Sequence, residues 1–192
     1  MGRPGDTAVT VRIGVFGGGQ LGQMLGTAAR SLGLELRVLD PDPACPAAAT
    51  AHAVVCGRLD DPAAAGQLAA QCDVLTLETE HVPIAVLAAA EALVPVRPGS
   101  SVLRLVADRL AQKRFLQAHG LPQPAFAWAH DTESLLAAVD QVGTPCVLKN
   151  RTGGYDGRGQ ARVRLPADAL AAWHGIGVAT TTRSSPALRN FR

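Results

Sequence analysis

The chain has 192 residues, of which 47% are hydrophobic, 4% aromatic and 18% charged, and its 18 basic and 16 acidic side chains give a formal net charge of +2. This composition supports a buried core and excludes a disordered chain, while so small a net charge gives no basis for a nucleic-acid partner. The length allows one large domain, or one small domain and part of another.

The cysteine pattern and the hydropathy of the chain exclude two further classes. Cys45, Cys56, Cys72 and Cys146 form no Cys-x-x-Cys pair, and no histidine lies beside them at the spacing of a zinc site. They are expected to be reduced, buried or half-buried thiols. The first ten residues are polar, and no apolar run reaches the ~20 residues that span a bilayer. We therefore expect a cytoplasmic protein with no zinc site and no membrane partner.

Strands and helices are predicted to alternate over the first hundred residues. Short apolar runs rich in β-branched residues predict buried strands at 11–16, 35–39, 54–55 and 74–77. Helices are predicted at 62–71, at 84–93 and at 21–32, where the apolar residues at helical spacing are Leu21, Met24, Leu25, Ala28 and Leu32. This order predicts an α/β fold with a parallel, Rossmann-like sheet flanked by helices.

The alternation ends at Val96-Arg97-Pro98-Gly99, and residues 100–119 are then predicted as helix in one or two pieces. A domain boundary is placed in the stiff, Gly- and Pro-containing stretch 120–124. Further strands are expected at 126–129, 146–149 and 161–164, and further helices at 134–142 and 166–173. Residues 174–192 contain no Asp or Glu and show no period. The predicted organisation is a first domain at 11–119, a second at 124–173, and an irregular or foreign tail at 174–192.

The first glycine motif lies between the first predicted strand and helix, where Gly17, Gly19 and Gly22 match G-x-G-x-x-G. Glycines let a backbone approach a ligand, and the N–H groups at a helix start favour an anion. Asp40 ends the next predicted strand, about where a ribose-binding acid lies in a dinucleotide fold. The motif therefore favours an NAD-binding oxidoreductase domain as one hypothesis, although such a turn often serves only close packing.

The second glycine motif is the more informative. A predicted strand ends in Lys149, and Gly153-Gly154-Tyr155-Asp156-Gly157-Arg158-Gly159-Gln160 follows. A mobile ammonium group and exposed backbone N–H groups suit phosphate oxygens, and a glycine-rich loop can close over a nucleotide. The G-K-[ST] ending of a Walker loop is missing, so a P-loop fold is not supported.

This loop resembles the phosphate-covering loop of ATP-grasp enzymes, and in particular that of the 5-(carboxyamino)imidazole ribonucleotide synthase family. Further segments similar to that family follow in its order: 17–24, Asp40-Pro41, 78–83, 96–99 and 108–113. The resemblance covers about Arg12 to Trp173. It implies a pre-ATP-grasp domain followed by part of an ATP-grasp domain, the lid subdomain.

The family resemblance implies a ligase of purine (IMP) biosynthesis. Bicarbonate takes the γ-phosphoryl group of ATP, and the resulting carboxyphosphate carboxylates the amine of aminoimidazole ribonucleotide. The implied partners are these small molecules, and a homodimer is expected for the full-length family. Two alternatives stay open beside the oxidoreductase: a non-catalytic nucleotide-binding fragment, and a related ATP-grasp carboxylase such as the formate-dependent glycinamide ribonucleotide transformylase or biotin carboxylase.

The resemblance also assigns site residues. The implied ATP-binding residues are Arg109, Lys149, Gly154, Tyr155, Asp156, Gly157, Arg158, Gly159 and Gln160. The implied substrate-binding residues are Gly19, Gln20, Leu21, Glu78, Glu80 and Tyr155, and the implied catalytic residues are Glu80 and Arg158. The two glutamates follow a predicted strand, where open α/β sheets bind ligands, and on an extended segment they would point the same way. Lys113 would share a helical face with Arg109.

A magnesium ion is expected for the full-length family, held there by a Glu and an Asn-Glu pair beyond the lid. No Asp or Glu follows Asp168 in this sequence. We therefore expect no metal ligands in this chain, which is read as truncated, and no bicarbonate-dependent ATPase activity from it alone.

Overall fold

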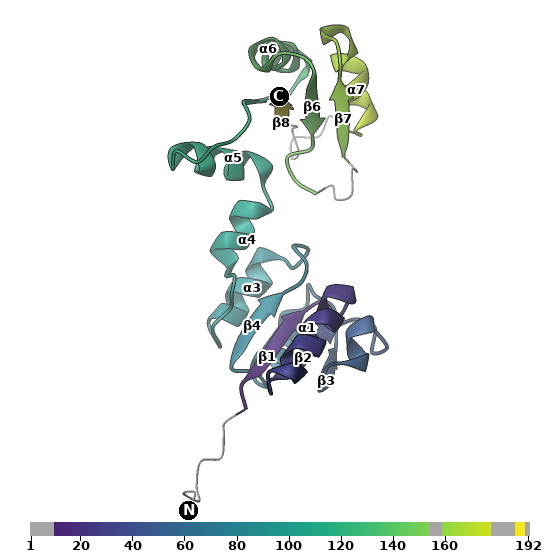
Figure 1. Cartoon of the computed structure of the whole chain (residues 1–192), viewed down its shortest axis with the longest axis vertical. Helices are drawn as coiled ribbons and strands as arrows, with labels where there is room; N and C mark the ends of the chain where they lie inside the picture. Colours follow the sequence, from purple (N-terminus) through teal and green to yellow (C-terminus); the bar gives the residue numbers. More distant parts are fainter. Residues whose placement is uncertain (1–9, 154–158, 178–186, 191–192) are drawn as a thin grey trace, which may run out of the picture. The chain divides into compact units, whose positions relative to one another are not determined.

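The computed structural model describes residues 10–153, 159–177 and 187–190 (Figure 1). The chain divides into two compact units, Met1–Arg104 and Leu105–Arg192. Within the described ranges, each helix is too short or too polar to cross a membrane.

The first unit is built on a parallel sheet of four strands, β1 (Arg12–Phe16), β2 (Glu35–Asp40), β3 (Ala53–Cys56) and β4 (Val74–Leu77). Their order is β3-β2-β1-β4, so β1 lies in the interior with β2 and β4 on its two sides. The predicted parallel α/β sheet is confirmed. Because the strands are parallel, their carboxyl ends meet at one edge, and the first glycine motif follows β1 there.

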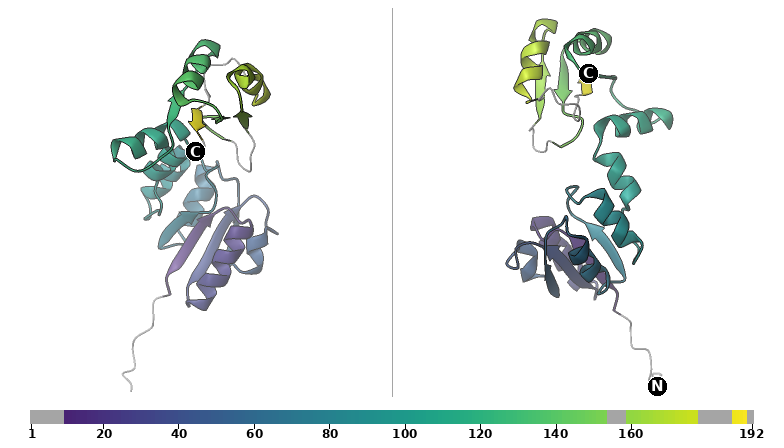
Figure 2. Two further views of the ribbon diagram at one scale, coloured as in Figure 1. Left: turned by 45° about the horizontal axis from the view of Figure 1, so that its top comes forward. Right: turned by 180° about the vertical axis from the view of Figure 1, so that it is seen from behind.

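Helices cover both faces of this sheet (Figure 2). Successive strand residues point to opposite faces, so Val15 packs with α1 (Gln20–Ser31) and the short helix η1 (Pro46–Ala49). Its neighbour Phe16 packs in a second core with α2 (Pro62–Ala69) and α3 (Ile84–Glu91). Both cores are apolar, which explains the continuous hydrophobic runs of the buried strands.

Helix α1 forms where helical spacing predicts it, but the apolar stripe that identified it lies in solvent. Leu21, Met24 and Leu32 are 57%, 66% and 73% exposed. The buried face carries small residues instead, Gly22, Gly26 and Ala29. Small residues let this helix approach η1 and the chain after it, because a Cβ at Gly26 would overlap Thr50.

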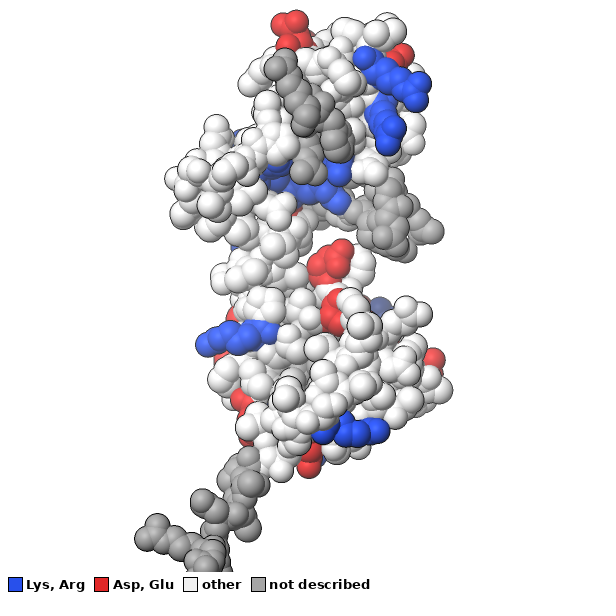
Figure 3. Space-filling view, in the orientation of Figure 1, with Lys and Arg blue, Asp and Glu red and all other residues white. Residues whose placement is uncertain are grey.

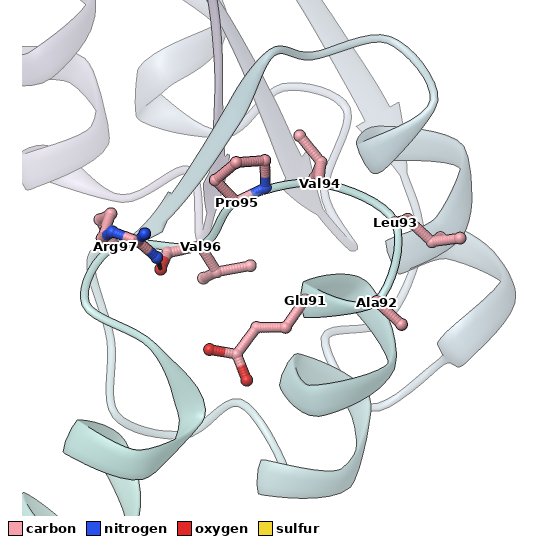
Figure 4. A pocket seen from close by; sticks show the side chains of 7 residues that line it. All are labelled: Glu91, Ala92, Leu93, Val94, Pro95, Val96 and Arg97. Atoms are coloured by element: carbon pink, nitrogen blue, oxygen red, sulfur yellow. Dashed lines mark hydrogen bonds between the residues drawn. The ribbon is translucent and has the colours of Figure 1, made fainter.

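The motif Val96-Arg97-Pro98-Gly99 builds the end of the first unit. The carboxylate of Glu91, at the end of α3, accepts hydrogen bonds from the Ser100 backbone N–H at 2.8 Å and from the Ser100 hydroxyl. These bonds lower the pKa of Glu91. A Cβ at Gly99 would collide with the Glu91 carboxylate in this position, so glycine leaves room for these hydrogen bonds. Glu91 and Arg97 border an open cavity of about 420 Å³, with the Leu93 side chain directed away from it (Figure 4). The motif thus has a structural explanation.

The second unit contains an antiparallel sheet in the order β5-β8-β6-β7. Its strands are β5 (Phe126–Trp128), β6 (Cys146–Lys149), β7 (Gln160–Val163) and β8 (Ala187–Asn190). Helices α6 (Thr132–Val142) and α7 (Ala169–Gly175), the second preceded by η2 (Pro166–Asp168), pack on one face. The core there includes Leu135, Leu148 and Trp173. The segment expected to be an irregular tail contributes β8, which pairs with both β5 and β6.

The helical stretch 100–119 consists of two helices, α4 (Ser100–Val106) and α5 (Arg109–Ala118). Asp108 separates them and caps α5, since its carboxylate accepts from the N–H groups of Leu110 and Ala111. The expected boundary lay at 120–124, whereas α5 groups with the second unit. The physical reason is that Asp108 and Arg109 are bonded to residues 150–153, which belong to the second unit.

Candidate functional site

Glu78, directly after β4, lies against the amino terminus of α1. Its Oε1 accepts a hydrogen bond from the N–H of Gly19 at 3.1 Å, and its Oε2 accepts one from Gly22 at 2.6 Å. The first N–H groups of a helix lack intrahelical partners and carry partial positive charge. The carboxylate therefore occupies donors that a phosphate would otherwise use. The backbone N–H groups of Gly19 and Gly22 in the first glycine motif are therefore already bonded to a carboxylate of the same chain.

Asp40, at the end of β2, holds the same loop from the other side. Its Oδ2 accepts from the N–H of Gly18 at 2.8 Å, and its Oδ1 accepts from the N–H of Asp42 at 2.9 Å. The oxidoreductase hypothesis assigned this carboxylate to ribose hydroxyls. Because both of its oxygens bond the backbone, and because Glu78 fills the helix terminus, the geometry disfavours a dinucleotide at this loop.

The other residues expected to bind substrate in the first unit are exposed. Gln20 and Leu21 lie in solvent at the start of α1. Glu80 is also exposed and lies in a turn. The extended segment expected from Glu78 to Glu80 is therefore a turn, so the alternation rule that would point both carboxylates one way does not apply. Of this group, the structure brings together Gly19 and Glu78.

In the second unit, Lys149 ends β6 and pairs in register with Gln160, which begins β7. Between these strands, the N–H of Asn150 donates to the carbonyl of Gly159 at 2.8 Å. Gly159 has φ +64, and a Cβ there would lie 2.7 Å from the Asn150 side chain. Glycine is therefore required where the loop returns to the sheet. Five predicted loop residues lie outside the described part of the chain: Gly154, Tyr155, Asp156, Gly157 and Arg158.

Arg109, the first residue of α5, contacts the start of this loop. Its guanidinium Nη1 donates to the carbonyl oxygens of Asn150 at 2.9 Å and of Gly153 at 2.5 Å. Its backbone N–H donates to the carbonyl of Arg151 at 2.9 Å. The structure thus places Arg109 at the strand-to-loop junction that follows Lys149.

Asp108 and Arg151 form a pair that the sequence analysis did not identify. Arg151 Nη2 lies 2.6 Å from Asp108 Oδ2, and Arg151 Nε donates to both carboxylate oxygens at 2.9 and 2.8 Å. These bonds lower the pKa of Asp108 and raise the pKa of Arg151. The Arg151 guanidinium also lies over the Trp128 ring, 5.1 Å from its centroid. The available signal was Asp108 itself, a helix-capping residue beside a predicted phosphate ligand.

Basic side chains gather on the second unit in Figure 3. The Lys113 ammonium lies 5.7 Å from the centroid of the Phe126 ring, so it contacts β5 in addition to sharing α5 with Arg109.

Among the residues that the structure describes, His, Cys, Asp and Glu form no group of three or more able to hold a metal ion. Arg109 and Lys149 are basic while Arg151 is paired with Asp108, so the side chains around the junction suit an anionic ligand such as a nucleotide phosphate.

Comparison with known families gives the same two-part organisation. Residues 10–107 match the ribonucleotide synthetase preATP-grasp domain, and residues 114–183 match the ATP-grasp domain. Fold and loops together define a preATP-grasp domain joined to part of an ATP-grasp domain. The chain belongs to the ribonucleotide synthetase preATP-grasp family, and it matches part of the N5-carboxyaminoimidazole ribonucleotide synthases.

Two relatives and two solved structures show the extent of the match. The N5-carboxyaminoimidazole ribonucleotide synthase of Pseudomonas aeruginosa is 41% identical over 168 residues, which are 87% of this chain and 46% of that protein. That of Brucella melitensis is 39% identical over 161 residues, 84% of this chain and 43% of that protein. The chain therefore spans somewhat less than half the length of these relatives.

The solved structures agree closely in fold. The N5-carboxyaminoimidazole synthetase of Staphylococcus aureus complexed with ADP has a TM-score of 0.85 at 30% identity, covering 94% of this chain and 47% of that one. The Aspergillus clavatus synthase in complex with ADP and 5-aminoimidazole ribonucleotide has a TM-score of 0.80 at 30% identity, covering 94% of this chain and 46% of that one.

Proposed function

We propose that this chain provides the preATP-grasp domain and the nucleotide-covering part of a ligase that uses ATP and bicarbonate to carboxylate 5-aminoimidazole ribonucleotide in purine biosynthesis. The observation that carries the proposal is the placement of Arg109 on the loop that follows Lys149. Relatives with this fold are synthases of that reaction, and one of their structures holds ADP and the ribonucleotide. ATP is accordingly the nucleotide we assign to the second unit.

The roles follow from charge and position. Lys149 and Arg109 bind phosphate oxygens, because cations stabilise the negative charge on a transferring phosphoryl group. Gly159 and Gln160 return the covering loop to β7, and the loop residues Gly154, Tyr155, Asp156, Gly157 and Arg158 complete the ATP site. Arg158 also stabilises the transferring group, and Tyr155 also contacts the substrate.

In the first unit, Gly19, Gln20 and Leu21 contact the ribonucleotide. The Glu78 carboxylate has lone pairs beyond those that accept from the α1 N–H groups, and these accept a hydrogen bond from an N–H donor of the substrate. Glu80, exposed in its turn, serves as the general base for the amine. The full-length family is expected to act as a homodimer, and nucleic acid and membranes are not among the proposed partners.

Magnesium accompanies ATP in phosphoryl transfer generally. The described residues include no group of acids or histidines that fits such an ion, so no step of the proposal runs through a metal held by this chain. What the chain contributes is binding and orientation of the nucleotide and of the amine.

Calorimetric titration of the full chain with ATP and with NAD tests the proposal. ATP is expected to bind more tightly, because the second unit offers cations whereas the first loop is closed by Glu78 and Asp40. Lys149→Met should weaken ATP binding about tenfold, the scale of one charge-assisted contact to phosphate. Arg164→Met, in an exposed residue just after β7, is the matched control and should leave the affinity within about twofold. Tighter binding of NAD than of ATP would refute the proposal.

A further inference from the structure

We propose that Asp108 and Arg151 form a clamp that positions the ATP-binding residues Arg109 and Lys149, a role that rests on the proposed function. The Asp108–Arg151 clamp comprises this ion pair and the hydrogen bonds that join residues 108–109 to residues 150–153. Neither residue needs to touch the nucleotide, so both are positioning residues rather than catalytic ones.

The contacts join two short segments at several points. Asp108 and Thr152 form an antiparallel β-bridge, and the Arg109 N–H donates to the Arg151 carbonyl at 2.9 Å. The side chains add the Asp108–Arg151 pair at 2.6 Å and the bonds from the Arg109 guanidinium to the loop. The start of α5 is therefore tied to the first residues after β6 by both backbone and side chain.

The geometry of the pair is specific. Arg151 presents two nitrogens to the carboxylate, Nε and Nη2, and its guanidinium is stacked over Trp128 at 5.1 Å. A planar guanidinium makes both contacts at once, whereas an ammonium would make neither in the same way. Asp108 is also shared, because the same carboxylate caps α5. Moving either side chain would therefore shift the start of the helix and the loop together.

The consequence of the clamp is that the basic side chains of Arg109 and Lys149 are oriented. Arg109 follows Asp108 directly, and Lys149 lies two residues before Arg151, so each ATP-binding residue lies within two positions of a clamp residue. Holding both in one arrangement before the nucleotide arrives removes an ordering cost from binding. A small misplacement of such groups can lower binding or rate by tenfold or more.

Asp108→Asn removes the charge that pairs with Arg151 but keeps the cap of α5, because Asn caps helices about as well as Asp. The matched control is Asp73→Asn, which removes an equally close pair, Arg12–Asp73 at 2.7 Å, from the first unit. Acrylamide quenching reads the clamp directly: Trp173 is 5% exposed, so the quenchable fluorescence comes from half-buried Trp128. Quenching should rise in Asp108→Asn, as Arg151 leaves the ring, and stay unchanged in Asp73→Asn.

ATP affinity is then measured by titration at a temperature where circular dichroism shows every variant folded. Asp108→Asn should weaken ATP binding about tenfold, and Asp73→Asn should change it less than about twofold. Arg151→Lys, which keeps the charge but loses the two-point contact, provides a second variant and should also weaken binding.

Unchanged quenching in Asp108→Asn would overturn the clamp, and raised quenching with unchanged ATP affinity would overturn its positioning role. If the wild-type chain binds no ATP, the proposed function fails and the positioning role with it, while the quenching result still decides whether the clamp exists.

Discussion

The two glycine-rich loops of this chain are held by side chains of opposite charge. In the first unit, the carboxylates of Asp40 and Glu78 accept hydrogen bonds from backbone N–H groups of the loop. In the second, the Arg109 guanidinium donates to backbone carbonyls at the base of the loop. Acids offset positive charge at the first loop, whereas Arg109 brings positive charge to the second, where Arg151 is paired with Asp108. Glycine content alone therefore does not indicate an anion site; the side chains that hold the loop decide it.

The largest expected effect comes from filling the first loop. Gly17 has φ +99, and a Cβ there would lie 2.6 Å from Glu78 Cγ. Gly17→Ala should lower the free energy of unfolding by about 3 kcal/mol, since it adds backbone strain and displaces Glu78. The control is Gly33→Ala, where φ is +70 but the space is open, with an expected cost of about 1 kcal/mol. Urea denaturation measures both, and equal costs would show that Glu78 does not close the loop.

Removing the charge of Glu78 while keeping its shape has a smaller expected effect. Glu78→Gln leaves one oxygen to accept from Gly19 and Gly22 and loses the favourable interaction with the start of α1. We expect a loss of about 1.5 kcal/mol in unfolding free energy. Glu80→Gln, in an exposed turn residue, should change it by less than about 0.5 kcal/mol. A loss as large in Glu80→Gln would contradict the distinction drawn between the two glutamates.

Acid should weaken a carboxylate–arginine pair in each unit. The hydrogen bonds from Arg12 lower the pKa of Asp73 to about 2, and those from Arg151 lower the pKa of Asp108. A carboxylate with a folded pKa below its unfolded value stabilises the protein above the unfolded value, and that stabilisation is lost as pH falls through the folded pKa. For Asp73 the window runs from the ordinary pKa of 3.8 down to about 2.

Urea midpoints measured across this window test the assignment. The wild-type midpoint should fall more steeply between these pH values than that of Asp73→Asn, which no longer has the titrating group. Asp108→Asn should likewise flatten the curve below the ordinary aspartate pKa. Parallel curves for the wild type and both variants would show that neither pair contributes.

The smallest expected effect on stability concerns the cysteine thiols. The buried thiols of both units should react equally slowly. Burial raises the pKa of Cys72 to about 11 and also raises the pKa of Cys45 and of Cys146. Cys56 is exposed. Since the thiolate is the reactive form, an aromatic disulfide reagent at pH 8 should label Cys56 rapidly and the others slowly. Cys56→Ser should remove the fast phase with little change in stability; a fast phase that persists would contradict this.

Much of the fold could be predicted from sequence because its signals are local. Strand 74–77 was predicted with the bounds that β4 has, because a short apolar run between polar residues defines both ends of a strand. The parallel sheet followed from the alternation of elements. The Arg109 and Lys149 assignments rested on a family resemblance, and the structure adds that both belong to the second unit.

What could not be predicted depends on contacts between distant segments. Glu78 bonds Gly22 across 56 residues of sequence, which requires knowing that β4 lies beside β1. The Asp108–Arg151 pair spans 43 residues and follows from the placement of α5 against the loop. The expectation that Glu78 and Glu80 point the same way assumed an extended segment where the chain turns. Pattern alone carries no information about which partner a charged side chain meets.

Helix α1 has a consequence for mutational tolerance. Its leucines and methionine would be ranked as essential by their spacing, and its glycines as replaceable. The structure reverses that order: Met24 and Leu32 are 66% and 73% exposed, while Gly26 is packed against Thr50. Polar residues at the two exposed positions would leave the core intact and reduce the apolar surface of the protein. A single methyl group at Gly26 would force the helix away from its neighbour, so the smallest residue of this helix is among its least replaceable.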